Sequence, residues 1–221
     1  LCIDADVLVT SKAIDELLQL AQDTDETWFS IQCKVLDKFF GGAAHAGNTL
    51  YRTSMLTSAL EFIPSDKKSL RPETAVLRKM AGLGHSWKSI DQVIGIHGYE
   101  QYYRDIYRTM FVRSHKHRPY ADILLRHWRN HESSDDDFKA AALGLRDGLL
   151  FDGQVSLDVN AFPPQKVSVL LDTYRLEEKS TLQFTQIPRI VQQQIDEYSP
   201  SAEFADLQKR MAEIDKQLTH K

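Results

Sequence analysis

Cysteine is scarce in this chain of 221 residues, in which only Cys2 and Cys33 occur. Both lie in apolar, strand-like stretches, so we expect reduced core residues of a cytoplasmic protein rather than a disulfide scaffold. Excess positive charge is also lacking, because 27 Lys and Arg against 31 Asp and Glu leave a net charge of -4. This balance argues against a general nucleic-acid-binding protein. No stretch approaches the roughly 18 consecutive apolar residues of a membrane span, and no signal peptide opens the chain.

The composition that remains is that of an ordinary globular protein. Hydrophobic residues make up 42% of the chain and charged residues 26%, which suffices for a buried core. The length suits one large domain or one and a half. The first residue is Leu and the chain opens inside an apolar strand, so we expect a fragment whose N-terminal part is missing.

Two carboxylates near the start, Asp4 and Asp6, form the most informative motif, in the segment LCIDADVL at 1–8. A short apolar strand is predicted to deliver them at its C-terminal end, where ligands bind in α/β sheets. The strand's period of two turns both side chains toward the same side. They could then share one Mg²⁺ or Mn²⁺ that neutralises a phosphate. The alternative is a solvated strand end followed by a helix cap.

Hydrophobic periodicity predicts alternating strands and helices after this motif. Strands are expected at 29–35, 49–52 and 90–97, and the small residues at 41–48 are expected to form a loop. Helices are expected from Thr10 or Ser11 to about 22, in the segment that carries Met55, Leu56 and Leu60, from Pro72 to Gly82 or Gly84, and over 99–116. The first helix should bury Ile14, Leu17, Leu18 and Ala21, and the third should bury Val76, Leu77 and Met80.

Further polar residues stand at the ends of these predicted elements. His97 ends the strand at 90–97, and an imidazole beside carboxylates would favour Mn²⁺ over Mg²⁺. Capping or packing is the alternative role of such a histidine. Glu73 lies in the first turn of the helix that begins at Pro72, near the positive end of its dipole. A basic run at 113–118 could attract a phosphate or an anionic lipid headgroup, although such runs are usually solvated faces.

Four stretches, in this order and spacing, resemble the metal-dependent nucleotide-sugar glycosyltransferases of the GT-A fold, family 2 type. They are CIDADVLV at 2–9, GNTLYRTSML at 47–56, RPETAVLRKMAGLG at 71–84 and VIGIHGYEQYYRDIYR at 93–108. The resemblance implies an α/β fold with a GT-A-like mixed sheet flanked by helices, of which the N-terminal nucleotide-binding half is missing. Residues 1–118 would be the C-terminal part of that catalytic domain, and 119–221 a mainly helical extension.

The resemblance also implies residue roles around the donor. Asp6 would be the direct ligand of Mn²⁺ or Mg²⁺, Asp4 would bind the metal or the ribose, and His97 would complete the metal site. Gly47 and Asn48 would belong to the loop over the nucleotide-sugar donor.

Glu73 would be the catalytic base of an inverting transfer. The enzyme would be a hexosyltransferase-like protein that moves a sugar to a hydroxyl of a glycan, lipid-linked or other acceptor. The chain alone would be inactive. It departs from the family at Glu73-Thr74, where an acidic pair is common, and at Asp105, where processive sugar polymerases have Trp after Gln-x-x-Arg. Polysaccharide synthesis is therefore not inferred.

Two other functions stay open. The first is a haloacid-dehalogenase-type phosphatase with Asp4 as nucleophile and Asp6 as acid, although Leu8 stands where that motif prefers Thr. The second is a non-catalytic, glycosyltransferase-like interaction module. No nucleic-acid partner is expected. Peripheral contact with the inner membrane face stays open, as does a homo-oligomer through the C-terminal helix.

Beyond residue 118 only local patterns guide the prediction. His127 and His131 stand four apart on a predicted helix, and surface histidines are favoured over a zinc site because no third ligand is evident. Residues 133–137 should form a loop and helix cap. Phe162-Pro163-Pro164 marks a boundary. A last helix opens at Ser199-Pro200, and its apolar residues Phe204, Leu207, Met211, Ile214 and Leu218 fit either packing on the chain itself or dimerisation.

Overall fold

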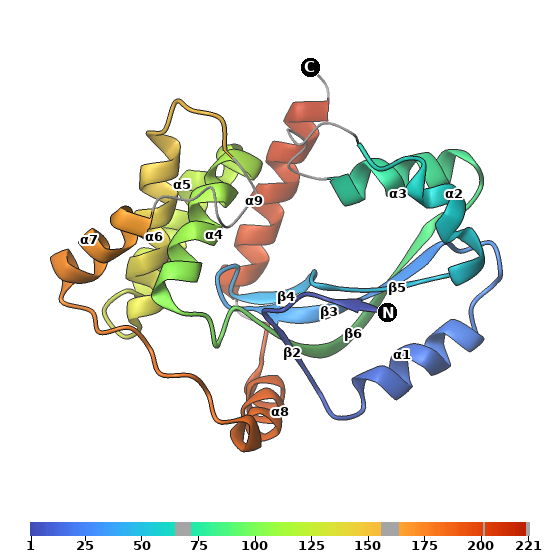
Figure 1. The fold of residues 1–221 in the computed structure, drawn as a ribbon, viewed down its shortest axis with the longest axis horizontal. Coiled ribbons are helices and arrows are strands. Elements are labelled where there is room, and N and C mark those ends of the chain that lie inside the picture. Colours follow the sequence, from blue (N-terminus) through green and yellow to red (C-terminus); the bar gives the residue numbers. More distant parts are fainter. Residues whose placement is uncertain (65–71, 156–163, 201, 220–221) are drawn as a thin grey trace. The chain divides into compact units, whose positions relative to one another are not determined.

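The computed structural model describes residues 1–64, 72–155, 164–200 and 202–219 (Figure 1). Its contacts divide the chain into two compact units. The first comprises Leu1–Tyr99 and Leu182–Tyr198, and the second comprises Glu100–Thr181 and Ser199–Lys221. This division differs from the predicted boundary at residue 118, because the helix α4, Tyr103–Lys116, packs on α6, Asp136–Leu149.

A mixed sheet is the centre of the first unit, which confirms the predicted α/β class. Its strand order is β1-β5-β3-β6-β2, with β4 paired to β3. The bounds are Cys2–Ile3 for β1, Val7–Val9 for β2, Ser30–Asp37 for β3, Gly42–His45 for β4, Asn48–Tyr51 for β5 and Trp87–His97 for β6. Strands β3 and β6 run parallel, and the other pairs are antiparallel. The carboxyl ends of β3 and β6 therefore meet at one edge.

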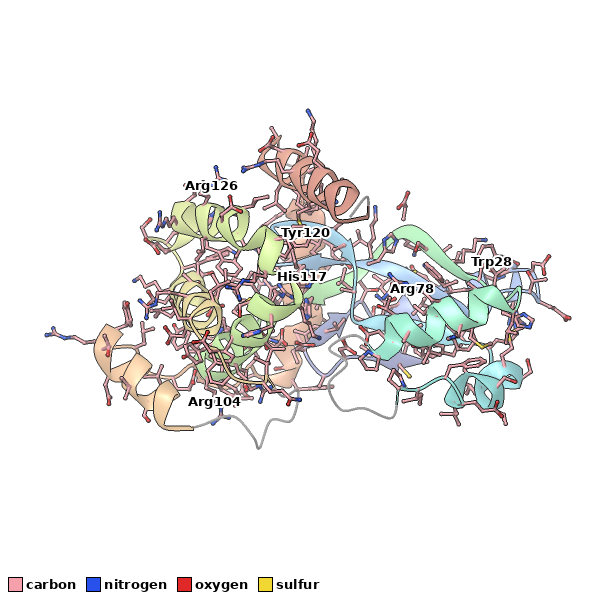
Figure 2. All side chains as sticks on the ribbon, turned by 90° about the horizontal axis from the view of Figure 1, so that it is seen from above. Trp28, Arg78, Arg104, His117, Tyr120 and Arg126 are labelled. Carbon is pink, nitrogen blue, oxygen red and sulfur yellow. The ribbon has the colours of Figure 1, made fainter. Side chains whose placement is uncertain are left out.

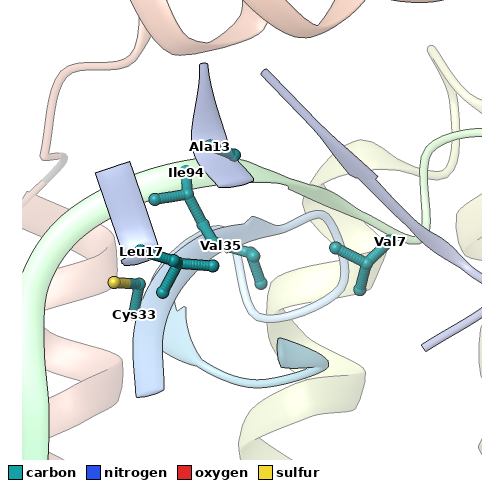
Figure 3. Packing of buried hydrophobic residues seen from close by; sticks show 6 residues of the cluster. All are labelled: Val7, Ala13, Leu17, Cys33, Val35 and Ile94. Carbon is teal, nitrogen blue, oxygen red and sulfur yellow. The ribbon is translucent and has the colours of Figure 1, made fainter. Parts of the chain in front are cut away.

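Helices bury both faces of the central strands. Helix α1, Ala13–Gln22, packs against a cluster that includes Cys33 and Val35 of β3 (Figure 3). Helix α8, Ile187–Glu197, follows the 3-10 turn η4 at Phe184–Gln186 and packs Val191 against Leu36. The predicted alternation is confirmed, since the inward-facing side chains of this segment are all buried: Phe29, Ile31, Cys33 and Val35.

Helix α1 corrects two local predictions. It begins at Ala13 after Lys12, which has no side-chain cap bond, so the prediction of a Thr10 or Ser11 cap is wrong. The helix meets the sheet through a narrow stripe that contains Ala13 and Leu17, both fully buried. The predicted inward residues Ile14 and Leu18 lie beside that stripe and are exposed.

The small-residue segment 41–48 is also corrected, because it contains the strand β4 instead of a continuous loop. Gly41 and Gly47, at φ 72° and 64°, adopt the left-handed backbone conformation on either side of this strand. Glycine tolerates this conformation without a steric penalty. The chain can therefore turn sharply into β4 and again into β5, with Val35 opposite Ala44 in the β3–β4 ladder.

Short helices follow β5: the 3-10 turn η1 at Thr53–Met55, then α2 at Leu56–Leu60 and α3 at Pro72–Gly82. The predicted start at Pro72 and end at Gly82 are confirmed. Met80 is fully buried, and Val76 and Leu77 pack beside it. Glu73 lies in the first turn of α3.

The described part of the second unit is helical. Besides α4 and α6 it contains the 3-10 turn η2 at Arg118–Tyr120, α5 at Ala121–His131, α7 at Pro164–Tyr174 and α9 at Ala202–Thr219. Helices α4 and α6 approach closely at Gly144 and Gly148, where a Cβ would clash with Tyr107 O and Phe111 O. Among the described residues, no helix is long and apolar enough to cross a membrane.

The histidines of this unit are packed more closely than expected. The prediction of surface histidines is wrong for His127, which is buried because its ring lies against His131 and Phe138, with centroids 4.8 and 6.2 Å away. In the basic run at 113–118, the His117 ring lies 5.7 Å from Tyr120 (Figure 2).

The remaining predictions for this unit have mixed outcomes. Asp135 caps α6 by accepting a hydrogen bond from Asp137 N, as predicted for 133–137. In α9, Phe204 and Leu207 are buried. The predicted boundary at 162–163 and the side chains of Ile214 and Leu218 lie outside the described residues.

Candidate functional site

Three polar side chains meet at one edge of the sheet because of the way its strands pair. Asp37 ends β3 and stands opposite His97 at the end of β6 in the parallel ladder. On the other side of β6, the antiparallel strand β2 places Val7 opposite His97. Asp6 directly precedes Val7 and therefore arrives at the same point.

His97 lies between the two carboxylates. Its Nδ1 is 2.9 Å from Asp37 Oδ2, and its Nε2 is 3.3 Å from Asp6 Oδ2. Asp37 is only 2% exposed, and its Oδ1 accepts hydrogen bonds from Phe39 N at 2.9 Å and Phe40 N at 3.0 Å. Asp37 is thus anchored by backbone, and it anchors the imidazole in turn.

The charges of this trio depend on one another. Burial disfavours the charged imidazole, but hydrogen bonds with Asp37 and Asp6 outweigh burial and raise the pKa of His97 to about 10. Burial likewise opposes ionisation of Asp6, and the hydrogen bond with His97 outweighs it and lowers the pKa of that carboxyl. The two carboxylates thus favour the imidazolium form of His97, in which both ring nitrogens donate to carboxylates.

Two glycines let β2 approach β6 closely enough to form this site. A Cβ on Gly95 would clash with Leu8 O of the neighbouring strand. Gly98 turns the chain directly after His97 with φ 81°, and its N–H donates to Asp6 O at 3.4 Å. A side chain at Gly95 would push β2 away from β6, and a Cβ on Gly98 would press on the Phe39 ring, 3.0 Å away.

The donor set of Asp6 and His97 fits one divalent cation. Two neighbouring ligands of an octahedral cation lie about 3 Å apart when each bond is about 2.1 Å long, close to the 3.3 Å between Asp6 Oδ2 and His97 Nε2. Asp37 then forms the carboxylate–histidine–metal arrangement that fixes the imidazole tautomer with Nδ1 protonated. A cation would have to displace the Nε2 proton.

The cation would depend on ligands from outside the chain. Within the ranges that the structure describes, no group of three or more His, Cys, Asp or Glu side chains is arranged to hold a metal ion. Asp6 and His97 would supply two ligands, and phosphate oxygens, water or the predicted ligand Asp4 would supply the others. Mg²⁺ is commonly bound in this way, through one or two carboxylates and substrate phosphates.

Asp4 lies on the turn between β1 and β2, with its side chain exposed. Its backbone holds the turn together, because Asp4 N donates to Gly47 O at 2.8 Å and Asp4 O accepts from Val7 N at 3.1 Å. The prediction that one strand delivers both carboxylates at its C-terminal end is therefore wrong, because β1 ends at Ile3 and the chain turns before β2 begins at Val7. The structure brings Asp6 to His97 and leaves Asp4 on the turn before them. The predicted contact of Asp4 with the metal or the ribose stays a prediction.

Gly47 and Asn48 build the support beneath that turn. A Cβ on Gly47 would clash with the Val7 side chain. Asn48 is buried, donates to Cys33 O and Ala46 O, and accepts from Cys33 N. These bonds occupy both of the amide's N–H donors. The contact of Gly47 and Asn48 with a donor stays a prediction.

Glu73 shares its surroundings with Asp4 through Tyr51. Burial raises the pKa of the Tyr51 hydroxyl, and the negative charges of Glu73 and Asp4 raise it further against a hydrogen bond with Thr49. Both carboxylates therefore lie within electrostatic reach of this hydroxyl.

Asp37 was not predicted as a site residue, although the sequence contained a pattern that pointed to it. The period-two series of Ile31, Cys33 and Val35 continues to Asp37, so the strand carries a carboxylate on a face that is otherwise apolar. No family model, curated protein or solved structure matches this chain. Its function is therefore inferred from the residues and their geometry.

Proposed function

We propose that the first unit belongs to an inverting, metal-dependent glycosyltransferase of the GT-A type that transfers a sugar from a nucleotide-sugar donor to an acceptor hydroxyl. The observation that carries the proposal is the pairing of Asp6 with His97 at the carboxyl edge of the sheet, 3.3 Å apart and supported by Asp37. An Asp-x-Asp motif, an acidic helix start and a strand-end histidine follow one another in the order of that family. The negative charges of Glu73 and Asp4 both raise the pKa of the Tyr51 hydroxyl.

The proposed reaction is a single displacement. The acceptor oxygen forms a bond to the anomeric carbon, and the bond from that carbon to the phosphate oxygen breaks. Its electron pair leaves with the nucleoside diphosphate. Glu73 accepts the proton of the acceptor hydroxyl as general base. A bound Mn²⁺ or Mg²⁺ would supply Lewis-acid stabilisation of the charge on the departing diphosphate.

The residues of the chain divide this work according to their surroundings. Asp6 and His97 would hold the cation, and Asp37 would keep the imidazole oriented while remaining buried itself. Asp4 would contact the cation or the ribose from the turn. Glu73, on a different element, would act at the acceptor without competing for the cation.

The decisive experiment measures reaction products of the full-length protein with Mn²⁺ and a panel of nucleotide sugars. We expect metal-dependent sugar transfer or slow donor hydrolysis, which Asp6→Ala removes and Asp15→Ala, an exposed change on α1, leaves intact. Release of phosphate from phosphomonoesters would support the phosphatase instead. If the protein performs neither reaction, it is a non-catalytic module.

A further inference from the structure

An apolar cavity of about 370 Å³ lies in the first unit beside α2 and α3. Leu56 and Leu60 of α2, Ile63, and Val76 and Leu77 of α3 contribute to its wall. Leu60 is 63% exposed and Ile63 is 52% exposed. A volume of this size is within the usual range of pockets for small molecules.

One charged side chain lines this cavity among the described residues, and it is Glu73. Tyr51 also lines the cavity, and its hydroxyl is the group on which the charges of Glu73 and Asp4 act. The cavity therefore joins an apolar wall to the carboxylate that the proposed mechanism uses as base. A ligand that fills the cavity therefore needs an apolar body and a proton-donating group that faces Glu73.

We propose that this cavity binds the acceptor, an inference that rests on the proposed function. The acceptor is a neutral alcohol that has an apolar body, and its hydroxyl faces Glu73. An anionic head group would lie near the carboxylate of Glu73 and would be repelled. A polar glycan would leave the leucine-rich wall without apolar contacts. A neutral alcohol can pack its apolar body against the wall and donate its hydroxyl proton to the carboxylate of Glu73.

Burial of an aliphatic chain gives the proposal a measurable scale. Each methylene that leaves water contributes about 0.8 kcal/mol, which corresponds to about fourfold in affinity. Binding of 1-hexanol, 1-heptanol and 1-octanol to the full-length protein should therefore tighten by about fourfold per carbon. Octyl phosphate should bind at least about tenfold more weakly than 1-octanol. Glu73→Gln should reduce this difference in affinity.

The affinities are to be measured by calorimetry without donor or metal, so that they do not depend on turnover. Leu60→Gln should weaken 1-octanol binding by about fivefold because the wall loses apolar surface. Leu83→Gln is the matched control, since Leu83 is 58% exposed and lies outside the cavity wall. Both changes replace an exposed leucine, so neither should unfold the protein.

Cys2 provides a second readout on the unmodified protein. Contrary to the prediction that both cysteines are core residues, Cys2 is exposed and lines the cavity, whereas Cys33 is buried. Burial also raises the pKa of the Cys33 thiol to about 11, which disfavours its reactive thiolate. Bound 1-octanol should therefore slow alkylation of Cys2 by iodoacetamide.

Several results would overturn the inference. One is affinity that does not depend on chain length, and another is an equal loss of binding in Leu60→Gln and Leu83→Gln. A third is that the protein self-associates, that Leu60→Gln makes it monomeric, and that alcohols do not bind. In that case the surface is an interface between two copies of the chain. Sugar transfer to polar glycans with no alcohol binding would refute the acceptor class and keep the proposed function. Alcohol binding without any sugar transfer would refute the proposed function and support the ligand class alone.

Discussion

Replacement of Asp37 by Asn tests the candidate site most directly. The Asp37→Asn side chain keeps the size of Asp37 and an oxygen that can accept from Phe39 N and Phe40 N. It loses the negative charge, and its NH₂ group faces His97 Nδ1, which now donates to Asp37 Oδ2 at 2.9 Å. Two donors would then face each other. The imidazole has to release its Nδ1 proton in order to accept from the amide.

The magnitude follows from the burial of the pair. His97 and Asp37 have side chains 12% and 2% exposed, so solvent screens their interaction little. A hydrogen bond to a charged group contributes about 1.5–3 kcal/mol, and breaking a buried ion pair costs about 3–5 kcal/mol. Because His97 can deprotonate, we expect a loss of about 2–3 kcal/mol in unfolding free energy at neutral pH. The pKa of His97 should fall from about 10 toward the ordinary 6.5.

Two measurements check this expectation. Denaturant unfolding gives the free-energy loss, and NMR titration of the imidazole nitrogens gives the pKa and the tautomer of His97. Asp91→Asn is the matched control, because Asp91 pairs with Lys34 at 2.8 Å and its side chain is 89% exposed. It should change neither readout. A His97 pKa near 10 in Asp37→Asn, or equal effects of both variants, would refute the assigned role of Asp37.

Three further predictions concern the same unit. Asp6→Ala should abolish Mn²⁺-dependent donor binding, because an anionic ligand is lost and the diphosphate charge is poorly neutralised; unchanged calorimetric binding would remove Asp6 from the metal site. Glu73→Gln should lower turnover about 100-fold or more while donor affinity persists; steady-state kinetics near wild type would leave Glu73 only a helix-stabilising role. Without metal, His97 should stabilise the fold fully below its ordinary pKa of 6.5 and lose this contribution as the pH rises through about 10. The difference in unfolding free energy between wild type and His97→Gln should therefore decrease as the pH rises over that range. An increasing difference would contradict the charged state assigned to Asp6, His97 and Asp37.

Features fixed by a few neighbouring residues could be predicted from the sequence. Alternating apolar side chains identified the strand that contains Ile31 and Val35, because a half-buried strand needs that period. Pro72 marked the start of α3, since its ring suits a first helical turn and lacks an N–H to be satisfied. The end of β6 at His97 followed from the same local pattern. These three predictions place the predicted metal ligand and the predicted base on the correct elements.

Features that depend on distant pairing could not be predicted. Asp37 and His97 are 60 residues apart, and only the parallel ladder of β3 and β6 makes them neighbours. Helix α8 returns from residues 187–197 to cover Leu36, although nothing local assigns it to the first unit. The segment 41–48 was mistaken for a loop because its small residues have weak strand preference. Pairing with β3 supplies the hydrogen bonds that override that preference.

The two carboxylates beside His97 differ in how firmly they are held in place, and this difference determines which of them can exchange its partner. Asp37 is buried and bound to two backbone N–H groups, so it can move only if the 37–40 turn moves. Asp6 lies on the turn before β2 with 31% of its side chain exposed. A ligand that enters from solvent can therefore displace Asp6 from His97 Nε2 without disturbing the buried Nδ1 bond. The fixed carboxylate keeps the imidazole in place, while the exposed one can change partners. The proposed exchange of the His97 Nε2 proton for a cation needs this asymmetry, because two fixed partners would hold both ring nitrogens protonated.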